Sequence, residues 1–187
     1  MREELGEAIE RSRSIVFDFD GTLFDIDVDW PGLRETLDEY CPGSDFKRLG
    51  MLHGLNALEE REGAGAVQEA FEVVLRFESA LPARPRLAII EHARKAKAEG
   101  KALAIFSANC RGTILKTLDD HDLHGVFDAV VGGDDVARRK PDPEGLLKAM
   151  MHCKMVPEET LYVADGEREI STAVAAGVRY HILEKVR

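Results

Sequence analysis

Two aspartates one residue apart, Asp18 and Asp20, directly follow the apolar run Ile15-Val16-Phe17 and are themselves followed by Gly21. Two carboxylates at the end of one strand repel each other. A divalent cation between them would offset that repulsion, because hard cations bind carboxylate oxygens. The carboxyl ends of parallel strands are also where α/β proteins hold their ligands. The segment therefore predicts a metal-assisted active site.

Three further polar groups follow or lie between apolar runs later in the chain. Ser107 comes directly after Ala102–Phe106, Asp165 comes directly after Thr160–Ala164, and Lys140 lies between them. A serine hydroxyl and nearby backbone amides can donate hydrogen bonds to phosphoryl oxygens, although a serine here is also typical of a helix N-cap. An ammonium can balance the charge of an anionic nucleophile and its anionic substrate. Judged on charge alone, Arg138 and Arg139 are alternatives to Lys140.

These four segments, in this order, resemble the motifs of the haloacid dehalogenase superfamily in its phosphatase branch. Asp18–Leu23 matches the DxDGT signature, and Lys140 stands in a KPDP context. The resemblance implies that Asp18 is the nucleophile that becomes an aspartyl-phosphate. It implies that Asp20 protonates the leaving oxygen and then deprotonates the hydrolytic water. Members that displace halide lack the second aspartate and transport ATPases carry threonine there, so Asp20 indicates a phosphatase or phosphomutase.

The same resemblance assigns phosphate binding to Ser107, the backbone amides of Ala108 and Asn109, and Lys140. In relatives asparagine often follows the serine or threonine directly, whereas Ala108 intervenes here before Asn109. Lys140 is also implied to hold the nucleophile and to stabilise charge on the transferring group.

The cofactor that the resemblance implies is Mg²⁺. Its direct ligands would be Asp18, the backbone carbonyl of Asp20, and Asp165, a set of oxygens that suits octahedral magnesium. Glu169 stands where relatives commonly have aspartate. It is expected to be an outer-shell acid that orients a bound water or pairs with Lys140. The alternative for Glu169 is an ordinary acid at a helix N-terminus.

The chain alternates strand-like and helix-like segments from Pro85 onward, which predicts an α/β fold with a doubly wound, Rossmann-like parallel sheet. The expected strands after the first are residues 102–106, 127–131, 160–164 and 178–182. The expected helices are residues 87–99, 111–121, 143–152 and 167–176.

The stretch between the first strand and residue 82 breaks this alternation, and it is too long for a simple crossover. It reads as three helices (31–40, 45–61 and 67–79), separated by the small-residue breaks 41–44 and 63–65. We therefore predict two domains: a catalytic core of residues 1–25 and 82–187, and an inserted small all-helical cap of residues 26–81.

Composition limits the kinds of binding partner and the cellular compartment that we expect. A net charge of −10 argues against nucleic acid or an anionic membrane as the main partner, because both would repel an acidic surface. The three cysteines are widely spaced and form no CxxC pair, which is typical of a reduced intracellular protein. No membrane-length apolar run and no signal peptide is evident. We expect a cytoplasmic protein whose main partner is a small phosphorylated metabolite; the sequence is compatible with a monomer and with a homodimer.

The expected function is Mg²⁺-dependent hydrolysis of a phosphate monoester of a small metabolite. The layout, with helices inserted just after the first motif, is similar to that of the phosphoglycolate phosphatase group. One alternative is a phosphomutase resembling β-phosphoglucomutase, which shares all four motifs. Another is a phospholigand-binding or regulatory protein without turnover, an alternative that the departures from the family pattern at Ala164 and Glu169 leave open.

Overall fold

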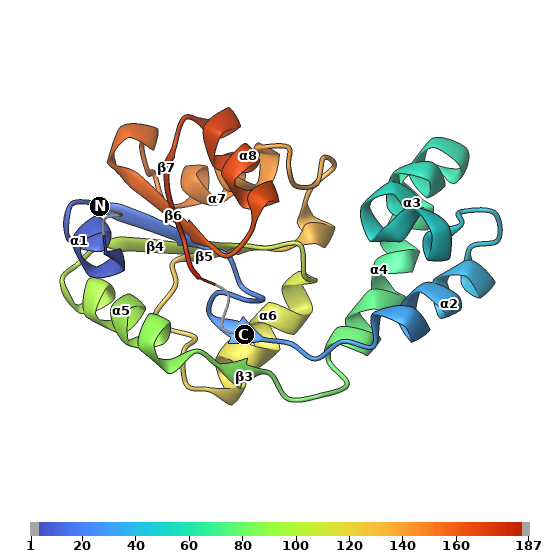
Figure 1. The fold of residues 1–187 in the computed structure, drawn as a ribbon, viewed down its shortest axis with the longest axis horizontal. Coiled ribbons are helices and arrows are strands. Elements are labelled where there is room, and N and C mark those ends of the chain that lie inside the picture. The colour runs from blue at the N-terminus through green and yellow to red at the C-terminus, as the bar shows by residue number, and fades with distance from the viewer. Residues whose placement is uncertain (1–3, 185–187) are drawn as a thin grey trace. The chain divides into compact units, whose positions relative to one another are not determined.

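The strand that precedes Asp18 is the central strand of a five-stranded sheet (Figure 1). All four residues of β1 (Ser14–Phe17) are buried, and β1 pairs in parallel with a strand on either side. The sheet order is β5-β4-β1-β6-β7. Its other strands are β4 (Ala102–Phe106), β5 (Ala129–Val131), β6 (Thr160–Ala164) and β7 (Arg179–Ile182). This computed structural model describes residues 4–184.

Helices cover both faces of the sheet (Figure 1). The strands progress outward from β1 to β5 and then outward in the other direction to β7, so right-handed connections place the helices on opposite faces. One face carries α7 (Glu144–His152) and α8 (Glu167–Ala176). The other carries α5 (Leu87–Ala98) and α6 (Arg111–Asp120), with α1 (Leu5–Glu10) beside α5. The predicted doubly wound α/β sheet is confirmed.

The core beneath α7 and α8 is built from alternate residues of the central strands. Val16, Ala104, Phe106 and Tyr162 project to the same face, because successive side chains of a strand point to opposite sides. They pack against apolar residues of the two helices, namely Leu146, Ala149, Met150, Ala173 and Ala176. Strands buried on both faces read as continuous apolar runs, which is why their positions were predicted well.

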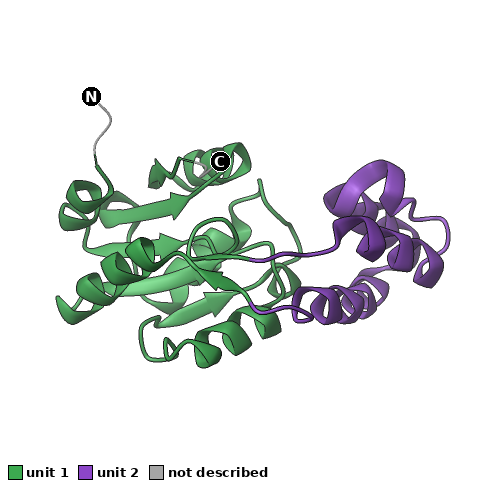
Figure 2. Ribbon diagram, turned by 60° about the horizontal axis from the view of Figure 1, so that its bottom comes forward, with its two compact units in different colours: residues 1–25, 83–187 green, residues 26–82 purple. Residues whose placement is uncertain are grey.

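The chain divides into two compact units (Figure 2). One contains the described residues up to Asp25 and from Ala83 onward, and the other is Ile26–Pro82. The second unit consists of α2 (Trp30–Tyr40), α3 (Phe46–Glu62) and α4 (Ala64–Glu78), which contact one another. Across the helices of residues 4–184, no apolar stretch has the length needed to span a membrane.

Several local features differ from the prediction. The break expected at 63–65 is present but shorter, because Gly63 (φ 87°) alone separates α3 from α4 and α4 begins at Ala64 instead of residue 67. Gly50 (φ 75°) kinks α3 internally.

Short elements were missed. Helix α1 was not predicted, nor were two short strands, β2 (Phe24–Asp25) and β3 (Arg84–Pro85), which pair antiparallel at the two ends of the insertion. Two 3₁₀ turns, η1 (Gly133–Asp135) and η2 (Pro157–Glu159), precede α7 and β6. Elements this short carry too few residues for a periodic pattern.

Gly145 allows α7 to pack directly on the ring of Phe106, because a Cβ at this position would overlap the ring atoms. We expect Gly145→Ala to destabilise the protein by about 1–3 kcal/mol through overpacking. The gain in helix propensity, at most about 1 kcal/mol, is smaller. Urea unfolding measures the change. The matched control is Gly6→Ala in α1, where the added Cβ lies 3.6 Å from His92 in ordinary contact. Equal effects of the two substitutions would contradict this account of Gly145.

Candidate active site

Parallel pairing brings the ends of three strands to one edge of the sheet. Phe17 is in register with Ile105 of β4 and Val163 of β6, so the residues that follow these strands emerge side by side. The backbone N–H of Asp18 extends the ladder by donating to the carbonyl of Val163 at 2.8 Å. The edge therefore gathers Asp18, Ser107 and Asp165, which are separated by about ninety and sixty positions in the sequence.

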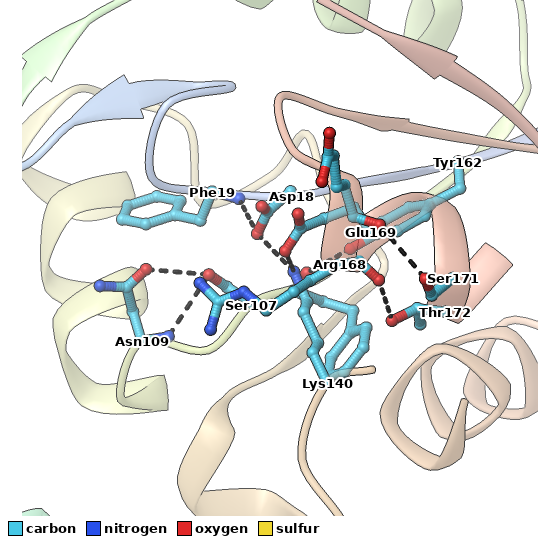
Figure 3. A network of polar contacts seen from close by, with 12 residues as sticks. Asp18, Phe19, Ser107, Asn109, Lys140, Tyr162, Arg168, Glu169, Ser171 and Thr172 are labelled. Atoms are coloured by element: carbon cyan, nitrogen blue, oxygen red, sulfur yellow. Dashed lines mark hydrogen bonds and ion pairs between the residues drawn. The ribbon is translucent and has the colours of Figure 1, made fainter. Parts of the chain in front are cut away.

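Lys140 reaches into this edge and contacts two carboxylates (Figure 3). Its Nζ lies 2.9 Å from Oδ1 of Asp18 and 3.4 Å from Oε1 of Glu169. The side chains of Lys140, Asp18 and Glu169 are 2%, 7% and 8% exposed, respectively. Removing one partner of ion pairs that are this well shielded from solvent is costly, because it leaves an uncompensated charge in the interior. Arg138, an alternative on charge alone, instead pairs at the surface with Asp142 and Glu144.

Two aromatic rings flank the ammonium of Lys140. Nζ is 4.9 Å from the ring centroid of Phe106 and 5.6 Å from that of Tyr162. Both distances fall within the range of a cation–π contact. Tyr162 is fully buried, and this burial, with smaller contributions from the carboxylates of Asp18, Glu169 and Asp165, raises its pKa well above the usual value of 10.0. The rings hold the ammonium while adding no competing charge.

Phe106 and Tyr162 were not predicted as site residues, because each lies inside an apolar strand run that reads as core. A signal does exist in the strand pairing. Val16 is in register with Tyr162, and it lies two residues before Asp18, so the three share one face of the sheet. Placing Tyr162 beside Asp18 in this way requires the register between β1 and β6, which cannot be read from the sequence.

Three carboxylates gather beside Lys140 in the described part of the chain. Asp18, Asp165 and Glu169 each offer an oxygen, and these oxygens lie within 4.8 Å of one another. Glycines make the approach possible: a Cβ on Gly21 (φ 75°) would lie 2.5 Å from Oδ2 of Asp165, and one on Gly166 would lie 2.5 Å from Oε2 of Glu169. One lysine does not balance three carboxylates. The donor set and its charge therefore fit a divalent cation.

Asp20 lies in the loop between β1 and β2, where its backbone bridges to Phe24. It is partly buried, and its side chain is not a member of the carboxylate cluster formed by the described residues. The neighbouring Gly21 donates its N–H to the carbonyl of Phe24 at 2.7 Å, which closes the turn.

Ser107 and Asn109 form a buried pair after β4 (Figure 3). The Ser107 hydroxyl donates to Oδ1 of Asn109 at 2.8 Å, and the Asn109 N–H donates to Oγ of Ser107 at 3.4 Å. Helix α6 begins only at Arg111 with Cys110 as its N-cap, so the interpretation of Ser107 as a helix N-cap is wrong. Asn109 is thus linked to Ser107 even though Ala108 intervenes between them.

Comparisons with known proteins identify the family to which this fold belongs. The family model for haloacid dehalogenase-like hydrolases matches residues 15–183. A phosphoglycolate phosphatase of Aquifex aeolicus is 32% identical over 177 residues, covering 89% of this chain and 82% of the relative. Pyrophosphatase PpaX of Bacillus velezensis is 30% identical over 188 residues, covering 91% of this chain and 82% of the relative.

Solved structures show the same similarity. A crystal structure described as a haloacid dehalogenase-like hydrolase from Bacteroides fragilis has a TM-score of 0.69 to this chain at 28% identity, covering 90% of this chain and 86% of that one. The chain belongs to the haloacid dehalogenase-like hydrolase family. Within that family it is a phosphatase, in the branch that resembles phosphoglycolate phosphatases.

Replacing Lys140 with methionine would leave the carboxylates of Asp18 and Glu169 buried without their cation. We expect Lys140→Met to lower the free energy of unfolding by about 3–5 kcal/mol, measured by urea denaturation in EDTA. The control is Lys116→Met, which breaks an i,i+4 pair with Asp120 between side chains that are 60% and 55% exposed. That exposed pair is expected to contribute no more than about 0.5 kcal/mol. A Lys140 effect as small as the control's would contradict the stabilising role of the buried pairs.

Proposed function

We propose that this protein hydrolyses the phosphate monoester of a small metabolite with Mg²⁺ and an aspartyl-phosphate intermediate. The observation that carries the proposal is the buried contact of 2.9 Å between Lys140 and Asp18, beside two further carboxylates. A carboxylate approaching a phosphoryl group meets like charge, so it needs a fixed cation next to it. Lys140 supplies one such charge in a position that the surrounding core determines.

The proposed reaction divides the work among named side chains. Asp18 attacks phosphorus and forms an acyl phosphate, while Asp20 donates a proton to the departing oxygen. Asp20 then takes a proton from the water that attacks the acyl phosphate, which releases inorganic phosphate and regenerates Asp18. Ser107 and the amides of Ala108 and Asn109 hold the phosphoryl oxygens. The Ser107 hydroxyl donates to Oδ1 of Asn109 and the Asn109 N–H donates to Oγ of Ser107, so in this reaction both donors exchange a bond within the loop for a bond to the substrate.

The metal would be held by Asp18, Asp165 and the backbone carbonyl of Asp20, with Glu169 next to them. When bound, it would neutralise phosphoryl charge and orient the transferring group, as in other phosphoryl-transfer enzymes. Glu169 contacts Lys140, which supports a role in orienting that ammonium as well as in completing the acidic set. The carboxylate cluster supports this assignment through its donor chemistry and its excess of negative charge.

The substrate proposal rests on the named relatives. Proteins called phosphoglycolate phosphatase are 25–32% identical to this chain, so a small phosphorylated carboxylic acid is the first candidate. Inorganic pyrophosphate is a second candidate, because a relative called a pyrophosphatase is 30% identical over nearly the same length. We propose that residues 26–82 act as a cap that selects the substrate, and that the protein works in the cytoplasm without nucleic acid or membrane.

The reaction is tested by phosphate release from a panel with Mg²⁺ present. The panel contains phosphoglycolate, pyrophosphate, a hexose 1-phosphate and unrelated monoesters. We expect wild-type protein to release phosphate preferentially from one compound, and Asp18→Asn to reduce release to background because its amide cannot act as the nucleophile. The control Asp120→Asn changes an exposed aspartate of α6 and should retain full activity. Conversion of the hexose phosphate to its isomer without phosphate release would indicate a mutase instead.

The metal site is tested by binding as well as by turnover. Mg²⁺ at about 100 times its Kd should stabilise the wild-type fold by about 2.7 kcal/mol, visible as a higher melting temperature in EDTA-treated protein after Mg²⁺ addition. Asp165→Asn removes one charged ligand and should largely abolish this stabilisation, while Asp120→Asn should preserve it. EDTA should also stop phosphate release, and Mg²⁺ should restore it. A melting temperature that does not respond to Mg²⁺ in wild-type protein would refute the site.

A further inference from the structure

The last residue of β5 and the segment that follows it form hydrogen bonds with residues 107–111. The carbonyl of Val131 accepts the N–H of Ser107 at 3.1 Å, which continues the strand ladder beyond β4. The N–H of Gly133 then donates to the carbonyl of Asn109 at 2.8 Å. Finally, the carboxylate of Asp134 accepts the N–H of Arg111 at 2.7 Å. These bonds connect the segment to the start, the middle and the end of the turn that leads into α6.

Two consecutive glycines let the backbones approach this closely. A Cβ on Gly132 would overlap the backbone nitrogen of Arg111 and the carboxylate of Asp134. A Cβ on Gly133 would overlap the carbonyl oxygen of Ala108. Gly132 has a φ of −93°, a conformation open to any residue, so the requirement for glycine here comes from space. The Gly-Gly pair that ends β5 therefore has a packing role against the phosphate-binding loop.

Asp134 is the one side chain among these contacts, and its position is electrostatically unfavourable. It is about half buried, and desolvation raises its pKa above the usual 3.8, opposed by the hydrogen bond from the Arg111 amide. The adjacent Asp135 adds a like charge that also raises this pKa. In these surroundings the Asp134 carboxylate accepts a hydrogen bond from the N–H of Arg111, the first residue of α6. The N-cap residue of that helix, Cys110, makes no side-chain cap of its own.

We propose that Asp134 is a positioning residue for phosphate binding. Its carboxylate accepts the N–H of Arg111. This contact fixes the backbone of residues 107–109, the loop whose hydroxyl and amides bind the phosphoryl oxygens in the proposed function. This inference rests on the proposed function, because it takes the loop of residues 107–109 as the phosphate site. Asp134 does not touch the substrate in this scheme. It acts through the geometry of the loop.

Steady-state kinetics and competition by inorganic phosphate test the proposal. Asp134→Ala removes the acceptor, and we expect KM for the monoester and the inhibition constant of phosphate to rise together by about tenfold. The value of kcat should change less than about threefold, since the loop binds phosphoryl oxygens similarly in substrate and transition state. Asp134→Asn keeps an oxygen acceptor and should return both constants to within about threefold of wild type. The control Asp120→Ala removes a carboxylate at the other end of α6.

A second pair of variants tests the same hydrogen bond from the donor's side. Arg111→Pro removes the N–H that Asp134 accepts, and Arg111→Ala keeps it, while both remove the guanidinium. Proline suits the first position of a helix, and Cys110 before it has φ −61° and ψ 137°, which a following proline allows. We expect phosphate to bind about tenfold more weakly to Arg111→Pro than to Arg111→Ala.

The outcomes separate this inference from the function on which it rests. Phosphate constants unchanged in Asp134→Ala, with only a lower melting temperature, would overturn the positioning role. An asparagine variant as impaired as the alanine variant would overturn the hydrogen-bond explanation. If wild-type protein hydrolyses no member of the panel, the proposed function fails. The positioning role is then decided by calorimetric titration of each variant with inorganic phosphate alone.

Discussion

The pairing of Lys140 with Asp18 is the interaction on which the remainder of the site depends. Parallel strands bring their carboxyl ends, and with them the aspartates that follow, to one edge of the sheet. Three carboxylates within 4.8 Å would repel one another strongly if no cation were among them. A lysine whose side chain is 2% exposed is itself costly to bury alone. Each charge is therefore stable because the other is present, and the buried Asp18 carboxylate and the Lys140 ammonium depend on each other.

Residues of the hydrophobic core, as well as the loops, fix the positions of Lys140 and Asp18. Phe106 and Tyr162 contact the ammonium from strands on either side of β1, and Gly145 leaves the space that seats the ring of Phe106 under α7. A buried ring has few alternative positions because protein interiors are close-packed. The position of the Lys140 ammonium is therefore set by hydrophobic packing, so residues that stabilise the fold also shape the proposed active site. Gly132 and Gly133 act on the segment of residues 107–111 in a similar way, because they leave space for its backbone and not because they adopt an unusual conformation.

All proposed catalytic and metal-binding residues belong to the unit that contains the sheet, and none lies in residues 26–82. The proposed catalytic and metal-binding groups thus lie outside the inserted helices, whose own core includes Leu33, Leu37 and Leu58. This separation is consistent with relatives that carry different substrate names, phosphoglycolate phosphatase and pyrophosphatase, at nearly equal identity to this chain. A common core can perform phosphoryl transfer while another part of the chain changes the choice of substrate.

The amino-acid sequence by itself determined the class of fold and the groups that resemble the family's catalytic residues. Buried parallel strands are continuous apolar runs, and Asp18, Ser107 and Asp165 stand directly after such runs, so local pattern was sufficient. The sequence did not reveal the short strands β2 and β3, the rings beside Lys140, or the hydrogen bond of Asp134. Only the tertiary structure decided these. Each depends on the register between strands or on contact between distant segments, and a shift of one residue in register would turn every side chain of a strand to the opposite face.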